Sequence, residues 1–264
     1  MKNKVSILMT SYNASAFIKN AIDSIKNQTY KNWELVIVDD CSSDHTLKII
    51  NQNKNKKIKI FSLEKHIGRT KALNYGLKKI KSKFIAILDA DDIADKNRIM
   101  LQKKFLIKNK KTLIVGTWYK IIDYSGKIID KIKISKKQNL IKEKMTYQNI
   151  FCHSSIMFRS ELLKKIGFYP SKIIYAQDYA FLLKSMKLHV PEILPKYLTL
   201  SRRIPNSMTF NPVYKKIIVL EKIKLLIFSI KNFKLTLKAK IIWSFKLIKA
   251  VYDFVIIVLF QSKN

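Results

Sequence analysis

The chain has 264 residues, of which 52 are Lys or Arg and 18 are Asp or Glu, so its formal net charge is +34. This basic excess is compatible with nucleic-acid binding, but Lys is spread over the whole chain without a recognition-helix pattern, zinc-finger spacing or aromatic single-strand motif. We therefore expect no nucleic-acid partner, and the absence of a P-loop and of a Gly-x-Gly-x-x-Gly fingerprint excludes those nucleotide-binding classes.

Apolar runs and segments with helical spacing alternate along the first third of the chain. In chain order they predict strand 5–10, helix 17–25, strand 33–38, a helix from about residue 43, strand 58–61, a helix over about 72–80 and strand 84–88. Asn13 or Ser11 offers an N-cap for the first helix. Strands that alternate with helices predict right-handed βαβ units and a parallel sheet, so the carboxyl ends of the strands should share one edge.

Two of these strands end in carboxylates. The acidic residues that follow strands 33–38 and 84–88 are Asp39, Asp40, Asp89, Asp91 and Asp92. Asp is common in turns and at helix N-caps, so one acidic strand end alone would indicate no more than a solvated loop. Two at one edge favour a divalent cation site, because Mg²⁺ and Mn²⁺ take one or two carboxylates together with substrate phosphates. We expect Tyr12, Asp40 and Asp91 to converge there.

Six segments of the chain carry motifs with a distinctive pattern: 5–13, 24–30, 34–44, 66–76, 152–159 and 175–179. Together these motifs resemble those of the family 2 glycosyltransferases with the GT-A fold, of the type that builds bacterial cell-surface polysaccharides. They occur in the family's order over roughly residues 4–210, with Cys41 where the family usually has Gly. The resemblance implies an α/β fold with a mostly parallel sheet flanked by helices.

The resemblance also implies a site for a nucleotide-diphosphate sugar and a divalent cation, Mn²⁺ or Mg²⁺. Asp91 is the implied metal ligand, Asp92 is a second ligand or the cap of the next helix, and Asp89 orients the ribose or a metal-bound water. A metal that bridges the phosphates would lower the barrier, because the leaving group gains charge as the glycosidic bond breaks.

Nucleotide contacts follow from the same resemblance. Thr10 and Tyr12 belong to the donor site, with Tyr12 as an aromatic wall against the base. The Asp40 carboxylate can accept from a ring N–H of uracil, guanine or thymine, so the donor base stays open.

Two arginines are implied as phosphate partners. Arg69 follows the Gly68 turn, and Arg202 precedes a segment, 205–207, that resembles one closing over the diphosphate. Ile204 replaces the family's usual His, which argues against a third, imidazole-type metal contact and favours Arg202.

On the acceptor side, transfer with inversion requires a general base on the face opposite the nucleotide, and the resemblance implies Asp178 in that role. The family more often has Glu before this Asp, and the loss of that like charge at Gln177 should leave Asp178 less inclined to bind a proton. Gln177 and His153 are expected to line the acceptor pocket. Asp178 also fits a cap for a helix over 179–186, which is compatible with catalysis.

The tail is cationic and apolar, with helical segments over 217–230 and 241–260. Its uninterrupted apolar run, 254–260, is far shorter than the roughly 20 residues that a membrane span needs. An amphipathic helix in the plane of an anionic membrane fits better, with Trp243 and Tyr252 at the interface. The alternative is that the tail packs on the catalytic domain or on a second subunit.

The sequence thus predicts a glycosyltransferase domain over 1–211 and a helical tail over 212–264. The predicted reaction moves a sugar, with inversion, to a hydroxyl of a growing cell-surface glycan or a lipid-linked saccharide. A sugar-phosphate nucleotidyltransferase and a catalytically silent membrane-surface protein are the alternatives. Cys41 and Cys152 do not require a disulfide, and we recognise no signal peptide before the first strand. We therefore expect a cytoplasmic protein, peripheral on the inner face of the cytoplasmic membrane.

Overall fold

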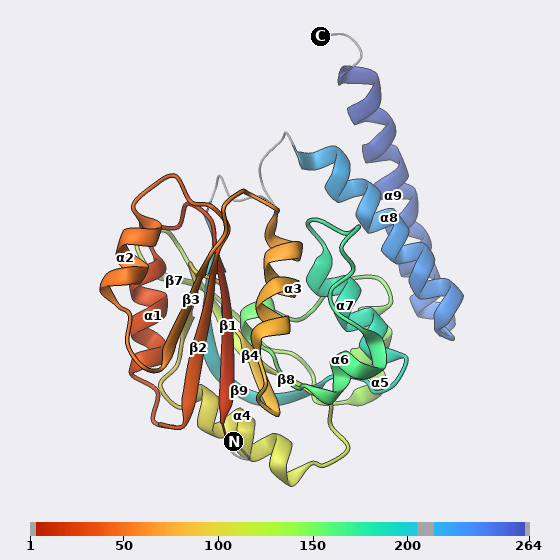
Figure 1. Ribbon diagram of the computed structural model, residues 1–264. Coiled ribbons are helices and arrows are strands. Elements are labelled where there is room, and N and C mark those ends of the chain that lie inside the picture. Colours follow the sequence, from red (N-terminus) through yellow and green to blue (C-terminus); the bar gives the residue numbers. More distant parts are fainter. Residues whose placement is uncertain (1–3, 205–213, 262–264) are drawn as a thin grey trace.

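The computed structural model describes residues 4–204 and 214–261. The amino-terminal elements alternate as predicted: β1 (Val5–Ser11), α1 (Ile18–Lys26), β2 (Trp33–Asp39), α2 (Thr46–Gln52), β3 (Ile58–Ser62), α3 (Arg69–Lys79) and β4 (Phe84–Ile87). Their strands are parallel neighbours in the order β3-β2-β1-β4 (Figure 1). The parallel half of the sheet is therefore confirmed.

The N-cap prediction for the first helix is wrong. Phe17 occupies the N-cap position of α1, and no side chain caps it. Ser11 Oγ instead donates to Asp39 Oδ1 at 2.9 Å, and Asn13 Oδ1 accepts from the Ser43 N–H at 2.9 Å. Both side chains thus fasten the β1 and β2 loops to each other.

The second half of the sheet mixes strand directions. Its elements are β5 (Ile93–Ala94), α4 (Arg98–Lys108), β6 (Ile114–Ile122), β7 (Ile128–Ile132), α5 (Gln138–Met145), η1 (His153–Ser155), β8 (Met157–Arg159), α6 (Glu161–Ile166), α7 (Gln177–Met186) and β9 (Glu192–Arg202). Strand β8 runs antiparallel to β4 and β6, whereas β9 runs parallel to β6. Within the described residues the sheet has nine strands, and β7 pairs with β6 through the turn around Gly126.

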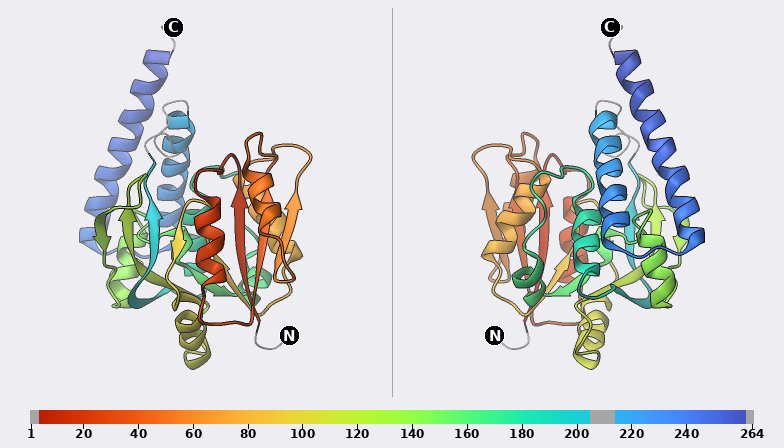
Figure 2. Two further views of the ribbon diagram at one scale, coloured as in Figure 1. Left: turned by 90° about the vertical axis from the view of Figure 1, so that its left-hand side faces the viewer. Right: turned by 90° about the vertical axis from the view of Figure 1, so that its right-hand side faces the viewer.

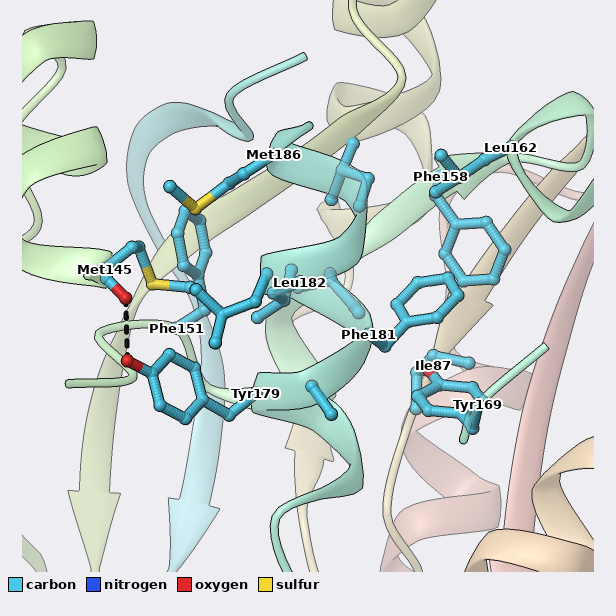
Figure 3. Packing of buried hydrophobic residues seen from close by; sticks show 14 of the residues in the cluster. Ile87, Met145, Phe151, Phe158, Leu162, Tyr169, Tyr179, Phe181, Leu182 and Met186 are labelled. Atoms are coloured by element: carbon cyan, nitrogen blue, oxygen red, sulfur yellow. Dashed lines mark hydrogen bonds between the residues drawn. The ribbon is translucent and has the colours of Figure 1, made fainter. Parts of the chain in front are cut away.

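The sheet lies between two hydrophobic layers because its central strands are apolar on both faces. Residues such as Ile7, Leu35 and Ile37 face the layer that contains α1 and α4, while Leu8 and Val36 face α3 and α7. Figure 3 shows the second layer from close by: α7 inserts Phe181 and Leu182 among side chains of other elements. The rings of Tyr169 and Phe181 stack with centroids 4.4 Å apart.

A helical hairpin, α8 (Lys215–Asn232) and α9 (Leu237–Gln261), follows the sheet and lies beside α7 (Figures 1 and 2). Leu225 and Leu226 of α8 and Ala239 of α9 belong to the same buried cluster as α7. Trp243 Nε1 donates to the Leu226 carbonyl at 2.8 Å, so this indole is used against α8 rather than at the predicted membrane interface. The hairpin therefore packs on the α/β domain.

The structure bears on membrane spanning, but two predictions near the start of the tail fall on residues that it does not describe. No helix in residues 4–204 and 214–261 is long and apolar enough to cross a membrane. The boundary at residue 211 and the segment 205–207 lie outside the described residues, so both stay predictions.

Gly76 explains how close α3 lies to the sheet. A Cβ at this position would lie 2.4 Å from Leu8 Cδ1 and 3.0 Å from Val38 Cγ2. Two turns earlier, Arg69 is the first residue of the same helix and lies beside the loop that follows β4, where it contacts Asp89. The close approach of α3 to the sheet thus also positions Arg69.

We expect Gly76→Val to lower the free energy of unfolding by about 1–3 kcal/mol, because the added methyl groups enter a filled core and this cost outweighs the better helix propensity of Val over Gly. Thermal unfolding measures the effect. Lys71→Val on the exposed side of α3 is the matched control, with an expected loss below about 1 kcal/mol. Equal losses in the two variants would contradict the packing argument.

Candidate active site

The loop that follows β4 carries three carboxylates beside the start of α3. Arg69 Nη2 forms an ion pair of 2.6 Å with Asp89 Oδ2 and lies 3.1 Å from His153 Nδ1. Burial would raise the pKa of Asp89, but Arg69 and His153 outweigh it and hold that pKa below its ordinary value. Asp89 is therefore a charged carboxylate in a fixed position.

Asp91 has no such partner. Among the described residues, no Lys, Arg or His forms an ion pair with its carboxylate. Burial and the neighbouring charge of Asp89 raise the pKa of Asp91 to about 6. A bound cation would relieve the same repulsion that a proton relieves, so Asp91 is the carboxylate best suited to a metal.

Asp92 is turned toward β9. Its Oδ1 accepts from the Arg202 backbone N–H at 2.7 Å, and its side chain is 3% exposed. Burial, together with the charges of Asp91 and Asp89, raises its pKa well above the ordinary value. The alternative of a helix cap is wrong, because Asn97 occupies the N-cap position of α4.

The carboxylates of the loop after β4 fit a divalent cation whose shell is completed by a substrate. Within residues 4–204 and 214–261, no three His, Cys, Asp or Glu side chains form a ready-made metal centre. Mn²⁺ and Mg²⁺ need no such cage, because they complete their shells with phosphate oxygens and water around one or two carboxylates.

Asp40, at the end of β2, holds the turn that leads into α3. Its two oxygens accept the backbone N–H groups of Ile67 at 2.8 Å and Gly68 at 2.9 Å, and the side chain is buried. His66 Nδ1 lies 3.0 Å from Asp40 Oδ2. A contact to a nucleotide base would have to share one of these oxygens, which can accept more than one hydrogen bond.

Tyr12 and His66 form an aromatic pair at this end of the sheet. Tyr12 is 49% exposed, and its ring centroid is 4.0 Å from that of His66. Thr10 is half-buried near the end of β1, opposite Val38 in register. Sequence reasoning missed His66, although its place just before Gly68 in the family-like motif was an available signal.

The turn after β2 explains the family's preference for Gly at position 41. Cys41 has φ 64°, in the left-handed region that side chains other than Gly adopt with strain. Asn13 has φ 49° in the facing loop, where Asn is better tolerated. Both loops are therefore held in unusual conformations beside Asp40.

Arg202 was predicted to contact phosphate, but its guanidinium is engaged within the protein. It donates to the carbonyls of Asp91 at 3.1 Å, Asp123 at 2.7 Å and Tyr124 at 2.8 Å, and it lies 4.6 Å from the centre of the Phe17 ring. Arg202 therefore joins the β6–β7 turn to the acidic loop, and its contact with phosphate stays a prediction.

His153 links the acidic loop to the helical layer. Its side chain is buried, with Nδ1 3.3 Å from Asp89 Oδ1 and Nε2 2.9 Å from the Tyr169 hydroxyl. Burial raises the pKa of Tyr169 well above its ordinary value, and the charges of Asp178 and Asp89 add to the effect. Tyr169, which sequence reasoning missed, therefore remains a neutral hydrogen-bonding partner of His153.

Asp178 lies in the first turn of α7, where the helix dipole favours a carboxylate. Asn149 Nδ2 donates to Asp178 Oδ2 at 2.8 Å, a contact that no sequence pattern indicated. Burial would lower the pKa of Arg69, but the carboxylates of Asp89 and Asp178 outweigh it and raise that pKa. The charges of Asp89, after β4, and of Asp178, on α7, thus both act on Arg69.

Gln177 was predicted to line the acceptor pocket, but its side chain is 1% exposed. Its amide nitrogen, correctly oriented, donates to the carbonyls of Tyr175 and Ile174 at 2.9 Å each. Gln177 therefore holds the segment before α7, and its place in the acceptor pocket stays a prediction. A Glu at this position could not make these bonds when ionised, because a carboxylate only accepts.

The fold and the acidic edge together define an α/β enzyme whose ligand binds beyond the carboxyl ends of parallel strands. Residues 6–167 match the family model described as glycosyl transferase family 2. The chain therefore belongs to glycosyl transferase family 2 and is a glycosyltransferase, which decides against the nucleotidyltransferase alternative.

Relatives with curated names agree with this assignment. An uncharacterized glycosyltransferase of Methanocaldococcus jannaschii is 34% identical over 221 residues, which cover 81% of this chain and 76% of that protein. The Escherichia coli UDP-Glc:alpha-D-GlcNAc-diphosphoundecaprenol beta-1,3-glucosyltransferase WfgD is 32% identical over 185 residues, covering 69% and 70% of the two chains.

Solved structures share the fold. Staphylococcus aureus TarS 1-349 in complex with UDP-GlcNAc superposes with a TM-score of 0.65 at 20% identity, covering 96% of this chain and 82% of that one. The Pyrobaculum calidifontis mannosyltransferase PcManGT in complex with GDP-Man and Mn²⁺ gives 0.67 at 18% identity, covering 94% and 73%. At these identities the comparison shows the GT-A fold alone.

The raised pKa of Asp91 predicts a stability gain in Asp91→Asn that depends on pH. The folded carboxyl has a pKa of about 6 against an ordinary value of 3.8, so its protonated form is favoured in the folded state. Stability is then retained below pH 4 and lost as pH rises through about 6. Without metal, we expect the free energy of unfolding of Asp91→Asn to exceed that of wild type by about 1–3 kcal/mol at pH 8 and to be almost equal to it at pH 4.

Thermal or denaturant unfolding at the two pH values measures this difference. Asp130→Asn, at an exposed carboxylate of β7, is the matched control and should show no gain at either pH. An Asp91→Asn gain that is equal at both pH values would mean that ionisation is not its cause.

Proposed function

We propose that this glycosyltransferase moves a sugar from a nucleotide-diphosphate donor, with inversion, to a hydroxyl of a growing cell-surface glycan or a lipid-linked saccharide. The observation that carries the proposal is the Asp91 carboxylate, which forms no ion pair within residues 4–204 and 214–261 and lies beside the fixed Arg69–Asp89 ion pair, with Asp178 acting electrostatically on the same arginine. One half of the site thus suits a charged leaving group, and the other suits a base.

On the donor side, Asp91 would hold Mn²⁺ or Mg²⁺, and the ion when bound would stabilise the negative charge of the departing diphosphate. The second oxygen of Asp92 could add to it, since the first accepts from Arg202. Arg69, at the start of α3, contributes a fixed positive charge. Tyr12 and His66 offer a face on which a base can stack, near Asp40.

On the acceptor side, Asp178 would take the proton of the attacking hydroxyl, since an alcohol is a poor nucleophile until that proton leaves. Asn149 holds one carboxylate oxygen at 2.8 Å and leaves the other for the acceptor. His153 is buried behind Asp89, so we propose that it supports the pocket through Tyr169 rather than touching the acceptor directly.

The substrate classes are supported by relatives. The name of WfgD specifies UDP-glucose and an acceptor on diphosphoundecaprenol, and TarS was solved with UDP-GlcNAc. PcManGT was solved with GDP-Man and Mn²⁺. We propose a nucleotide sugar of this kind and a lipid-linked acceptor for this chain.

An exposed apolar face on α9 supports contact with an anionic membrane. Its side chains recur three or four residues apart and are between 46% and 76% exposed: Leu237, Ile241, Phe245, Ile248, Tyr252, Val255 and Leu259. Exposed lysines, Lys238, Lys240 and Lys249, lie on the same helix. We propose that this face inserts shallowly into the inner face of the cytoplasmic membrane, where lysines attract acidic lipids.

Two substitutions separate donor binding from transfer. We expect Asp178→Asn to lower transfer by about 10²–10⁴-fold through loss of the base, while UDP, GDP or TDP with Mn²⁺ still raises its melting temperature as in wild type. In Asp91→Asn, both transfer and the Mn²⁺-dependent rise over its own unliganded value should be lost. Full transfer by Asp178→Asn, or no nucleotide effect on wild type, would contradict the proposal.

The double substitution Phe245→Glu/Ile248→Glu should abolish sedimentation with vesicles that contain phosphatidylglycerol. Ile128→Glu/Ile129→Glu on β7 introduces the same charge at exposed isoleucines and should leave sedimentation unchanged. Equal behaviour of the two variants would refute the membrane proposal. Conversion of a wild-type dimer to a monomer by the α9 change would assign the face to a second copy instead.

A further inference from the structure

The segment 173–176 precedes α7, and its backbone carbonyls accept hydrogen bonds from two side chains on different helices. Thr70 Oγ1 of α3 donates to the Ile173 carbonyl at 2.8 Å and to the Ile174 carbonyl at 3.3 Å. The Gln177 amide donates to the carbonyls of Ile174 and Tyr175. These bonds tie the segment to the donor half of the site and to α7 itself.

The N–H groups of the same segment are bound by one side chain of the C-terminal hairpin. Glu221 of α8 accepts from Ile174 N–H through Oε1 at 2.5 Å, and from Tyr175 and Ala176 N–H through Oε2 at 2.9 Å each. Its side chain is 3% exposed. Among the described residues, these amides rather than a Lys or Arg are its partners.

The place of Glu221 connects it to Asp178. Ala176 is the N-cap residue of α7, and Asp178 lies two residues later in its first turn. A carboxylate bound to consecutive amides at this helix start fixes where the first turn begins, because each bond restricts the backbone. The ring of Tyr214, just before α8, lies 5.1 Å from that of Tyr175 and adds a second contact at the same place.

Attachment of the hairpin does not by itself require this buried charge. Leu225 and Leu226 already bury α8 in the core, and Ser229 Oγ donates to the Thr146 carbonyl at 2.5 Å. Burial of a carboxylate is unfavourable unless its oxygens are hydrogen-bonded, and here they are bonded to the backbone that leads into Asp178.

We infer that Glu221 is a positioning residue for Asp178, so that the C-terminal hairpin completes the catalytic site. The inference rests on the proposed role of Asp178 as base. Glu221 acts through the backbone of 174–176, and displacement of Asp178 by about 1 Å would be enough to reduce transfer by about 10²-fold.

The test compares full-length Glu221→Ala, Glu221→Gln and Ser229→Ala, with Ser229→Ala as the control for a buried polar contact of the same helix. Transfer is measured as nucleoside diphosphate release from UDP-glucose, UDP-N-acetylglucosamine or GDP-mannose, with diphosphoundecaprenol-linked N-acetylglucosamine as acceptor. We expect Glu221→Ala to lower kcat by about 10- to 100-fold with the donor KM unchanged. Ser229→Ala should keep the wild-type kcat. Glu221→Gln, which keeps one acceptor oxygen, should fall between them.

Amide hydrogen exchange gives a readout that needs no substrate. Exchange of residues 174–180 should be faster in both Glu221 variants than in Ser229→Ala. Wild-type kcat and wild-type exchange in a folded Glu221 variant would overturn the inference, and Glu221→Gln decides it if Glu221→Ala does not fold.

A double variant distinguishes this failure from failure of the proposed function. In the Asp178→Asn background, Glu221→Ala should cause no further loss of kcat, since the base is already absent. Undiminished transfer by Asp178→Asn alone would instead show that the base lies elsewhere. If wild type turns over none of the donors, the proposed substrates fail, and hydrogen exchange alone decides whether Glu221 orders the segment.

Discussion

The ion pair between Arg69 and Asp89 is the interaction on which the acidic edge of this enzyme depends. It joins the first residue of α3 to the loop after β4 at 2.6 Å and keeps the pKa of Asp89 low, although burial acts in the opposite direction. The same guanidinium contacts His153 and is influenced by Asp178. One side chain therefore holds Asp89 and His153 together, and the close packing of Gly76 against Leu8 fixes the helix that carries it.

The remaining carboxylates are not compensated in this way. Burial and mutual repulsion raise the pKa of Asp91 and of Asp92, and the neighbouring turn holds Cys41 in a left-handed conformation. Such local conflicts with stability concentrate where function requires them. In this chain they surround the position at which we propose that a cation and a diphosphate bind.

The C-terminal hairpin has two different surfaces. The inner side of α8 enters the same core as α7 and binds the backbone before Asp178 through Glu221. The outer side of α9 leaves large apolar side chains such as Phe245 and Tyr252 exposed. Packing on the domain is therefore found on one face of the hairpin, and the membrane contact that we propose would use the other, because each helix of a hairpin buries only one side against the body it joins.

The sequence by itself determined the parallel half of the sheet, the acidic strand ends and the family, because periodicity and motif spacing are local properties of the chain. It did not determine the antiparallel β8 or the partners of Asp92, Arg202 and Gln177. The Asp92 carboxylate meets the Arg202 amide across 110 positions, and Glu221 meets Ile174 across 47. Only the tertiary structure decided these pairings, because a hydrogen bond requires a distance and an orientation that residues so far apart acquire when the whole chain packs.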